Sequence, residues 1–217
     1  MKQRTLLACI AVLSLNAAAL GGRIPLPTTL DMLLPDGDFV TVGDLTFDNF
    51  TYLASGDMPT PEQINVDALG DDGIRFTGPF LDLPGGIGNG ASDATLAFTV
   101  TSDSLIDGVT LSGNPSVLAG PGDGSASVTE TFVGLADVKL DIFDISTGLN
   151  TVDSVSIPGT NSLSVIKDIL LFTADPEQEA TLSVIDQSFS IPEPSSSSLC
   201  LLAGLLGIAA VRKKRRA

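Results

Sequence analysis

The sequence predicts an all-β domain, an antiparallel β-sandwich of immunoglobulin-like or jelly-roll-like type, over residues 38–191. Residues 94–101 alternate apolar with small or hydroxyl side chains, and residues 138–144 repeat an apolar alternation. A period of two places successive residues on opposite faces of a strand, so each run is expected to bury one face. Glycine-rich segments such as 84–90 and 120–124 favour turns. Their spacing of roughly ten residues per strand is typical of a sandwich.

Further runs of β-forming residues are predicted as strands at 39–47, 50–54, 64–68, 74–77, 109–111, 125–132, 151–157 and 180–189. Residues 162–172 are ambiguous, because Leu163, Ile166 and Leu170 have helical spacing; the surrounding β pattern favours a strand. Asn49, in a tripeptide that matches a glycosylation site, is interpreted as an ordinary polar strand residue. Residues 20–37, rich in proline, are predicted to be a lead-in segment.

The charge of the chain is concentrated in its middle. The whole sequence has a net charge of −15, whereas residues 20–191 hold 4 basic and 25 acidic residues, which is 4 − 25 = −21. Such a surface repels phosphates, so we expect no nucleic-acid partner. The acidic residues favour solubility and leave a structural calcium ion possible. No ligand set is assigned to calcium, because none of the Asp-Gly segments has the spacing of an EF-hand loop.

Several catalytic classes are excluded by residue type. The chain has no histidine, and its two cysteines, Cys9 and Cys200, lie in the apolar terminal segments. Ser-His-Asp and Cys-His nucleophilic sites therefore cannot form in the middle of the chain, nor can zinc sites built on histidine. A pair of carboxylates is sufficient for glycoside hydrolysis, but the pattern singles out no pair. We expect that the protein is not an enzyme, with no catalytic residue and no metal ligand assigned.

The first 19 residues are predicted to be a secretory signal peptide. Lys2 and Arg4 precede an apolar run at 6–15, and Ala17 and Ala19 form a small-x-small cleavage site. The apolar run is too short for a permanent membrane span. Cleavage after Ala19 is expected to export the remainder of the chain.

The last 26 residues, 192–217, have three consecutive parts. Pro192, Glu193 and Pro194 interrupt any helix or central strand. An apolar, uncharged stretch at 199–211 is predicted to be a transmembrane helix. Five basic residues follow it and are expected to stay on the cytoplasmic side of the membrane: Arg212, Lys213, Lys214, Arg215 and Arg216. Both ends of the chain thus predict the same orientation, with the middle outside.

This order of a Pro-Glu-Pro tripeptide, a short apolar helix and a basic cluster resembles the PEP-CTERM sorting signal. The resemblance implies that an exosortase, an integral-membrane enzyme with a cysteine nucleophile, recognises residues 192–194 and processes the membrane-anchored precursor there. It also implies a final location at the cell surface or outside the cell, in bacteria that make extracellular polysaccharide. The alternative interpretation of the tail is an ordinary single-span anchor.

Two hypotheses for the middle of the chain follow. The first is a structural or interaction role in the envelope or in a biofilm matrix, linked to extracellular polysaccharide. The second is a carbohydrate-binding module for that polysaccharide. Sugar sites usually stack the ligand on aromatic rings. Here the aromatic residues are Tyr52 and ten phenylalanines, with no tryptophan, which favours the first hypothesis.

Overall fold

The computed structural model describes residues 21–83, 91–118, 124–173 and 178–192. In these residues the chain forms antiparallel strands and two short 3-10 helices, with no α-helix, so the all-β prediction is confirmed. The elements are β1 (Thr28–Thr29), η1 (Leu30–Leu33), β2 (Phe39–Val42), β3 (Leu45–Ser55), η2 (Pro61–Gln63), β4 (Asn65–Leu69), β5 (Gly73–Asp82), β6 (Ala91–Gly113), β7 (Ser116–Val117), β8 (Ser125–Phe132), β9 (Lys139–Ile145), β10 (Gly148–Asn150), β11 (Val152–Phe172) and β12 (Ala180–Ser190). The predicted signal peptide and the predicted transmembrane helix lie outside the described residues.

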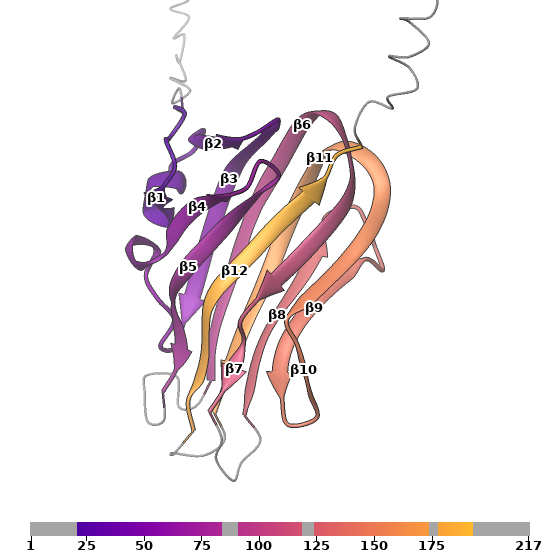
Figure 1. Ribbon diagram of the computed structural model, residues 1–217. Helices are drawn as coiled ribbons and strands as arrows, with labels where there is room; N and C mark the ends of the chain where they lie inside the picture. Colours follow the sequence, from indigo (N-terminus) through magenta and orange to yellow (C-terminus); the bar gives the residue numbers. More distant parts are fainter. Residues whose placement is uncertain (1–20, 84–90, 119–123, 174–177, 193–217) are drawn as a thin grey trace, which may run out of the picture.

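The strands form a β-sandwich of two layers (Figure 1). The front layer has the order β1-β4-β5-β12, followed by the second half of β6 and the first half of β11. The back layer contains β2 and β3, the first half of β6, the second half of β11, and then β8, β9 and β10. The two longest strands therefore belong to both layers and join them along one edge.

The bend in β6 and β11 occurs where their pairing is irregular. Ser156 pairs with Gly108 on one side of the bend and Ser162 pairs with Thr101 on the other, with register shifts between them. Asn161 Nδ2 donates hydrogen bonds to the carbonyls of Ser102 and Ser104, at 3.0 and 3.1 Å, on the facing strand. These bonds satisfy backbone acceptors at the bend. The runs predicted as separate strands, 94–101 with 109–111 and 151–157 with 162–172, are thus single bent strands.

A bulge in β3 sets the direction of two core rings. Phe47 and Phe50 are three residues apart, which in a regular strand places their side chains on opposite faces. The pairing of β3 with β6 shifts between Asp48 and Thr51, and Asn49 has a φ of 54°. The extra residue of the bulge turns both rings into the core, where they are 0% and 3% exposed. The interpretation of Asn49 as an ordinary strand residue was therefore wrong.

The hydrophobic core lies between the layers and includes part of the predicted lead-in segment. Leu30 and Leu33 of η1 are buried, and β1 pairs with β4. In β6 the alternation is as predicted, because Leu96, Phe98 and Val100 are all buried. The segment 162–172, which had both helical and strand spacing, is a strand within β11.

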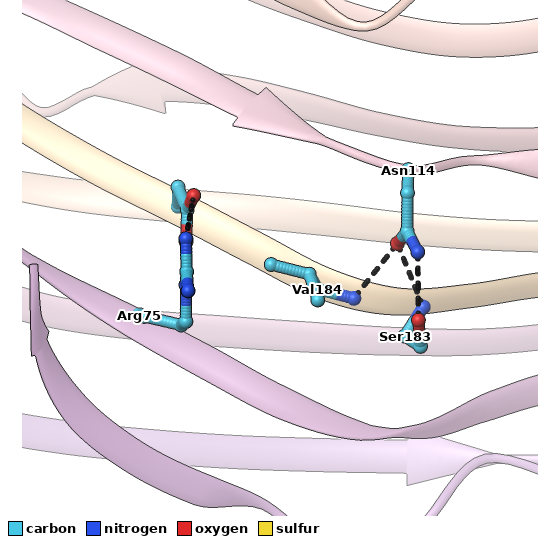
Figure 2. Close-up of polar contacts among 5 residues, drawn as sticks. Arg75, Asn114, Ser183 and Val184 are labelled. Atoms are coloured by element: carbon cyan, nitrogen blue, oxygen red, sulfur yellow. Dashed lines mark hydrogen bonds and ion pairs between the residues drawn. The ribbon is translucent and has the colours of Figure 1, made fainter.

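Strand β12 is held in the front layer by a side chain from β5 and by another that directly follows β6 (Figure 2). Arg75 of β5 makes a bidentate ion pair with Asp186, at 2.6 and 2.7 Å. Asn114, which follows β6, accepts hydrogen bonds from the backbone N–H groups of Ser183 and Val184 at 3.0 and 2.8 Å. These N–H groups lie at the point where the pairing of β12 with β5 shifts register. Asn114 therefore takes the place of a backbone acceptor at an irregular position.

Replacing Asn114 with alanine is expected to lower the free energy of unfolding by about 1 kcal/mol, because two backbone donors lose their acceptor at an exposed site. Asn114→Asp keeps an acceptor oxygen and is expected to lose less. Denaturant unfolding of the two variants measures the difference. Equal losses in both variants would contradict the role of the Asn114 oxygen.

Candidate functional site

Three polar side chains, which we call the buried triad, meet in the core between the two layers. Lys167 of β11 and Glu130 of β8 come from the back layer, and Gln187 of β12 comes from the front layer. Each of the three residues is 0% exposed. Lys167 Nζ donates hydrogen bonds to both Glu130 Oε2 and Gln187 Oε1. Gln187 Nε2 donates to the carbonyl of Thr110 at 3.1 Å, which fixes the orientation of the amide.

The surroundings of the buried triad favour its uncharged forms. Burial raises the pKa of Glu130, although Lys167 opposes the shift. Burial lowers the pKa of Lys167, with Glu130 opposing. The ring of Phe98 lies 6.0 Å from Lys167 Nζ. Within the described residues Glu130 Oε1 has no hydrogen-bond partner. A buried carboxylate with one unpaired oxygen is costly, and burial acts against the charged form of both Glu130 and Lys167.

The side chains of the buried triad point into the core because successive residues of a strand alternate between its two faces. Lys167 shares its face with Val165 and Ile169, both of which are buried. Glu130 lies two residues after Val128, and Gln187 lies two residues before Phe189, again on faces that are buried. Three polar residues thus occupy positions that the strand period assigns to the core.

A second buried polar group, which we call the strand-end clasp, joins the ends of several strands. Asp82, the last residue of β5, accepts hydrogen bonds from Ser92 Oγ at 2.8 Å and from Thr173 Oγ1 and N at 2.6 and 3.0 Å. Ser92 Oγ in turn accepts from the backbone N–H of Asp57 at 2.8 Å. Because Asp82 belongs to the front layer, Ser92 to the back layer, and Thr173 directly follows the end of β11 in the back layer, the clasp connects the two layers.

The outer face of the back layer has an apolar patch, which we call the outer patch. Across β9, β8 and β11, Phe143 is in register with Ser127 and Leu170, and Ile145 is in register with Ser125 and Phe172. Leu170 and Phe172 are 41% and 37% exposed. Polar groups border the patch: Thr129 Oγ1 donates to Asp141 Oδ1 at 2.8 Å, and Asp93 lies near Asp168. Partial burial, followed by the charge of Asp93, raises the pKa of Asp168.

The end of β12 opens into a cleft of about 570 Å³, which we call the junction cleft. It is lined by the turn at Gly43 and Asp44, by Asp71 and Asp72, by Ser104 at the bend of β6, and by the last described residues, 189–192. Phe189 N donates to the carbonyl of Asp72 at 2.9 Å, so β12 stays bonded almost to its end. Three carboxylates therefore line the cleft where the chain leaves the sandwich.

A family match begins at this end of β12 and continues into the residues that follow it. Residues 190–216 match the family description "PEP-CTERM protein-sorting motif". The chain carries a PEP-CTERM sorting motif. The match begins at Ser190, the last residue of β12, and includes the predicted Pro-Glu-Pro tripeptide and basic cluster. The PEP-CTERM motif implies an exported protein that is targeted to an exosortase.

Comparisons beyond the PEP-CTERM motif are weak. No curated protein matches the chain. One similar solved structure is TmCBM61 in complex with beta-1,4-galactotriose, with 10% identity and a TM-score of 0.32, covering 64% of this chain and 88% of that one. Another is from carbohydrate-binding modules of the β-sandwich superfamily, with 14% identity and a TM-score of 0.24, covering 70% and 58%. At these scores the likeness identifies no shared site or ligand.

Of the residues predicted for sorting, the structure describes Pro192, which is exposed. Glu193 and Pro194, the cleavage-site residues Ala17 and Ala19, and the basic cluster 212–216 lie outside the described residues. Among the residues that are described, no helix is long and apolar enough to cross a membrane. Also within that part of the chain, no three Cys, Asp or Glu side chains gather in a way that could hold a metal ion.

The buried triad was not among the sites predicted from the sequence. The signal was available, because Lys167 and Glu130 lie within predicted strands at positions whose neighbours two residues away are apolar. For Lys167 the alternation of buried and exposed positions was not recognised, because the apolar residues of 162–172 also have helical spacing. That the three side chains converge depends on the pairing of distant strands.

Proposed function

We propose that this protein is an exported, exosortase-sorted component of the cell surface or extracellular matrix, with a structural or interaction role and no enzymatic turnover. The observation that carries the proposal is the position of the PEP-CTERM motif, which begins at the last residue of β12. No residues therefore separate the sandwich from the start of the PEP-CTERM motif. The sandwich is the domain that the motif directs to its location.

The charge distribution supports this location. Residues 20–191 have a net charge of −21, from 4 basic and 25 acidic residues. A strongly acidic domain stays soluble at high local concentration and repels copies of itself, which suits a component of a hydrated matrix. The biofilm matrix is the setting that we propose, with extracellular polysaccharide as its main neighbour.

The test is the intact mass and the location of the protein in its own host, with and without the exosortase. With the exosortase, we expect a mature species that starts near Leu20, lacks the tail beyond about residue 194 and lies outside the inner membrane. Without it, the full tail is expected to remain in the membrane. Full-length protein in the membrane of both strains would overturn the sorting role and leave a simple anchored domain.

Variants of the PEP-CTERM motif provide a second test. Glu193→Ala, and separately deletion of residues 212–216, are expected to leave the precursor unprocessed in the membrane, because each removes one part of the sorting signal. Glu62→Ala is the matched control, since it removes an exposed carboxylate in η2, outside the PEP-CTERM motif. Normal processing of both motif variants would contradict the proposal.

Polysaccharide binding is a second candidate function, supported by the outer patch. A half-exposed ring at Phe172, bordered by hydroxyl and carboxylate groups, is the kind of surface that holds a sugar. Phe172→Ala is expected to weaken binding to the host's polysaccharide roughly tenfold. Leu53→Ala, an exposed apolar residue elsewhere on the back layer, serves as the control. If both variants were retained equally in a polysaccharide pull-down, the outer patch would be excluded as the polysaccharide-binding site.

A further inference from the structure

The buried triad contains the groups needed to form an amide bond. Lys167 supplies a primary amine, Gln187 supplies a carboxamide, and Glu130 supplies a carboxyl group that touches the same amine. All three are fully buried between the layers, and they approach from three different strands. An ion pair in this position gains little over an apolar core, because removing both charges from water costs as much as their attraction returns. Stability alone therefore gives a poor reason for this cluster.

We propose that Lys167 and Gln187 join through an intramolecular isopeptide bond, with Glu130 as the acid–base catalyst of the reaction. Lys167 Nζ already contacts the oxygen of the Gln187 amide, so nucleophile and carbonyl are held together before the reaction. Glu130 lies within hydrogen-bond reach of the same nitrogen, which is the geometry that proton transfer requires. The proposal does not depend on sorting of the tail.

The reaction balances without any further reagent. The lone pair of neutral Lys167 Nζ attacks Gln187 Cδ while the protonated Glu130 carboxyl donates a hydrogen bond to the developing oxyanion. The proton lost by Nζ passes through Glu130 to Gln187 Nε2. The Cδ–Nε2 bond then breaks, ammonia leaves, and the Nζ–Cδ amide remains. Nothing is oxidised or reduced, and Glu130 ends the reaction with the proton that it held at the start.

The surroundings of the buried triad favour formation of the amide bond. Burial raises the pKa of Glu130 and lowers the pKa of Lys167, and both shifts act in the direction of the acid form and the free amine that the reaction uses. The carbonyl of Thr110 accepts a hydrogen bond from the departing Nε2 at 3.1 Å and so fixes the amide before the reaction. The apolar walls, which include Phe98, exclude the water that hydrolyses an amide. Departure of ammonia from the site prevents the reverse reaction.

The bond would link β11 in the back layer to β12 in the front layer, three residues before the PEP-CTERM motif begins. A load applied through the C-terminal end of the sandwich acts first on β12. With the cross-link, that load passes from Gln187 into β11 and the back layer, so β12 cannot peel away from the sheet. A closed loop between residues 167 and 187 also restricts the unfolded chain.

The mass of the intact, folded full chain is the direct test. We expect a mass lower than the sequence of the same species by one ammonia, about 17 Da. Proteolysis is expected to release a branched peptide that joins Lys167 to Gln187. Lys167→Met, Gln187→Leu and Glu130→Gln are each expected to restore the full mass. Lys139→Met, at an exposed lysine, is the matched control and is expected to keep the deficit.

The wild-type measurement decides the proposal even if a variant fails to fold. A folded wild-type chain with its full mass would overturn it. A loss of one water, about 18 Da, would show that Lys167 condenses with Glu130 and would overturn the role of Gln187. A deficit that persists in Lys167→Met would assign the lost ammonia to another site and would also overturn it. Loss of the cross-link in Glu130→Gln is expected to lower Tm by roughly 10 °C.

Discussion

Replacing Phe98 with alanine is expected to lower the free energy of unfolding by about 3–5 kcal/mol. Its ring is 2% exposed and lies at the centre of an aromatic cluster. The ring centroids of Phe47, Phe50 and Phe76 lie 6.0, 5.6 and 6.0 Å away, from β3 and from β5 of the opposite layer. Removing the ring leaves a cavity bounded by both layers, which cannot close because the bent strands β6 and β11 fix their separation.

Denaturant unfolding of the isolated chain measures this loss, and Phe172→Ala is the matched control. Phe172 is also a strand phenylalanine, but its ring lies on the outer patch and is partly exposed. Its replacement is expected to cost about 1 kcal/mol. If Phe98→Ala destabilised the protein no more than Phe172→Ala, the aromatic cluster would not be the main stabilising contact between the layers.

Replacing Asp82 with alanine is expected to cost about 3 kcal/mol, because it removes the acceptor at the centre of the strand-end clasp. Ser92 Oγ, Thr173 Oγ1 and Thr173 N all donate to its carboxylate in a buried site. Without Asp82 these donors are left unsatisfied, and the ends of β5, β6 and β11 lose their connection. Asp82→Asn keeps one acceptor oxygen and is expected to cost about half as much.

The control for this prediction is Asp141→Ala. Asp141 also accepts a hydrogen bond from a threonine and contacts a lysine, yet its side chain is 30% exposed and water can replace those contacts. A cost below about 1 kcal/mol is expected. Hydrogen exchange should then report local opening at the ends of β5 and β6 in Asp82→Ala alone. Equal destabilisation by the two alanine variants would mean that burial adds nothing to the clasp.

Much of the fold follows from local sequence patterns. The alternation of Leu96, Phe98 and Val100 predicted a strand with one buried face, and those residues are buried. The predicted run 125–132 coincides with β8, and the run 180–189 lies within β12. These predictions held because the strand period depends on neighbours in sequence. The bends in β6 and β11 were not predicted. A break in the apolar alternation looks the same in the sequence whether the chain makes a turn between two strands or one strand bends from one layer into the other.

The PEP-CTERM motif was identified from sequence for a related reason. Pro192, Glu193 and Pro194 are consecutive, and the apolar stretch and basic cluster follow in order, so no tertiary contact is needed to recognise them.

By itself, the sequence determined the all-β class, the strand faces and the sorting motif, because all three are properties of residues close together along the chain. Only the tertiary structure decided that Glu130, Lys167 and Gln187 meet. Each lies at a strand position that the apolar alternation assigns to the core. The three residues come from β8, β11 and β12, however, and their convergence depends on which strands pair and which layers face each other. The same holds for Asp82 and its partners. Chemistry that needs several side chains at one point is set by long-range pairing.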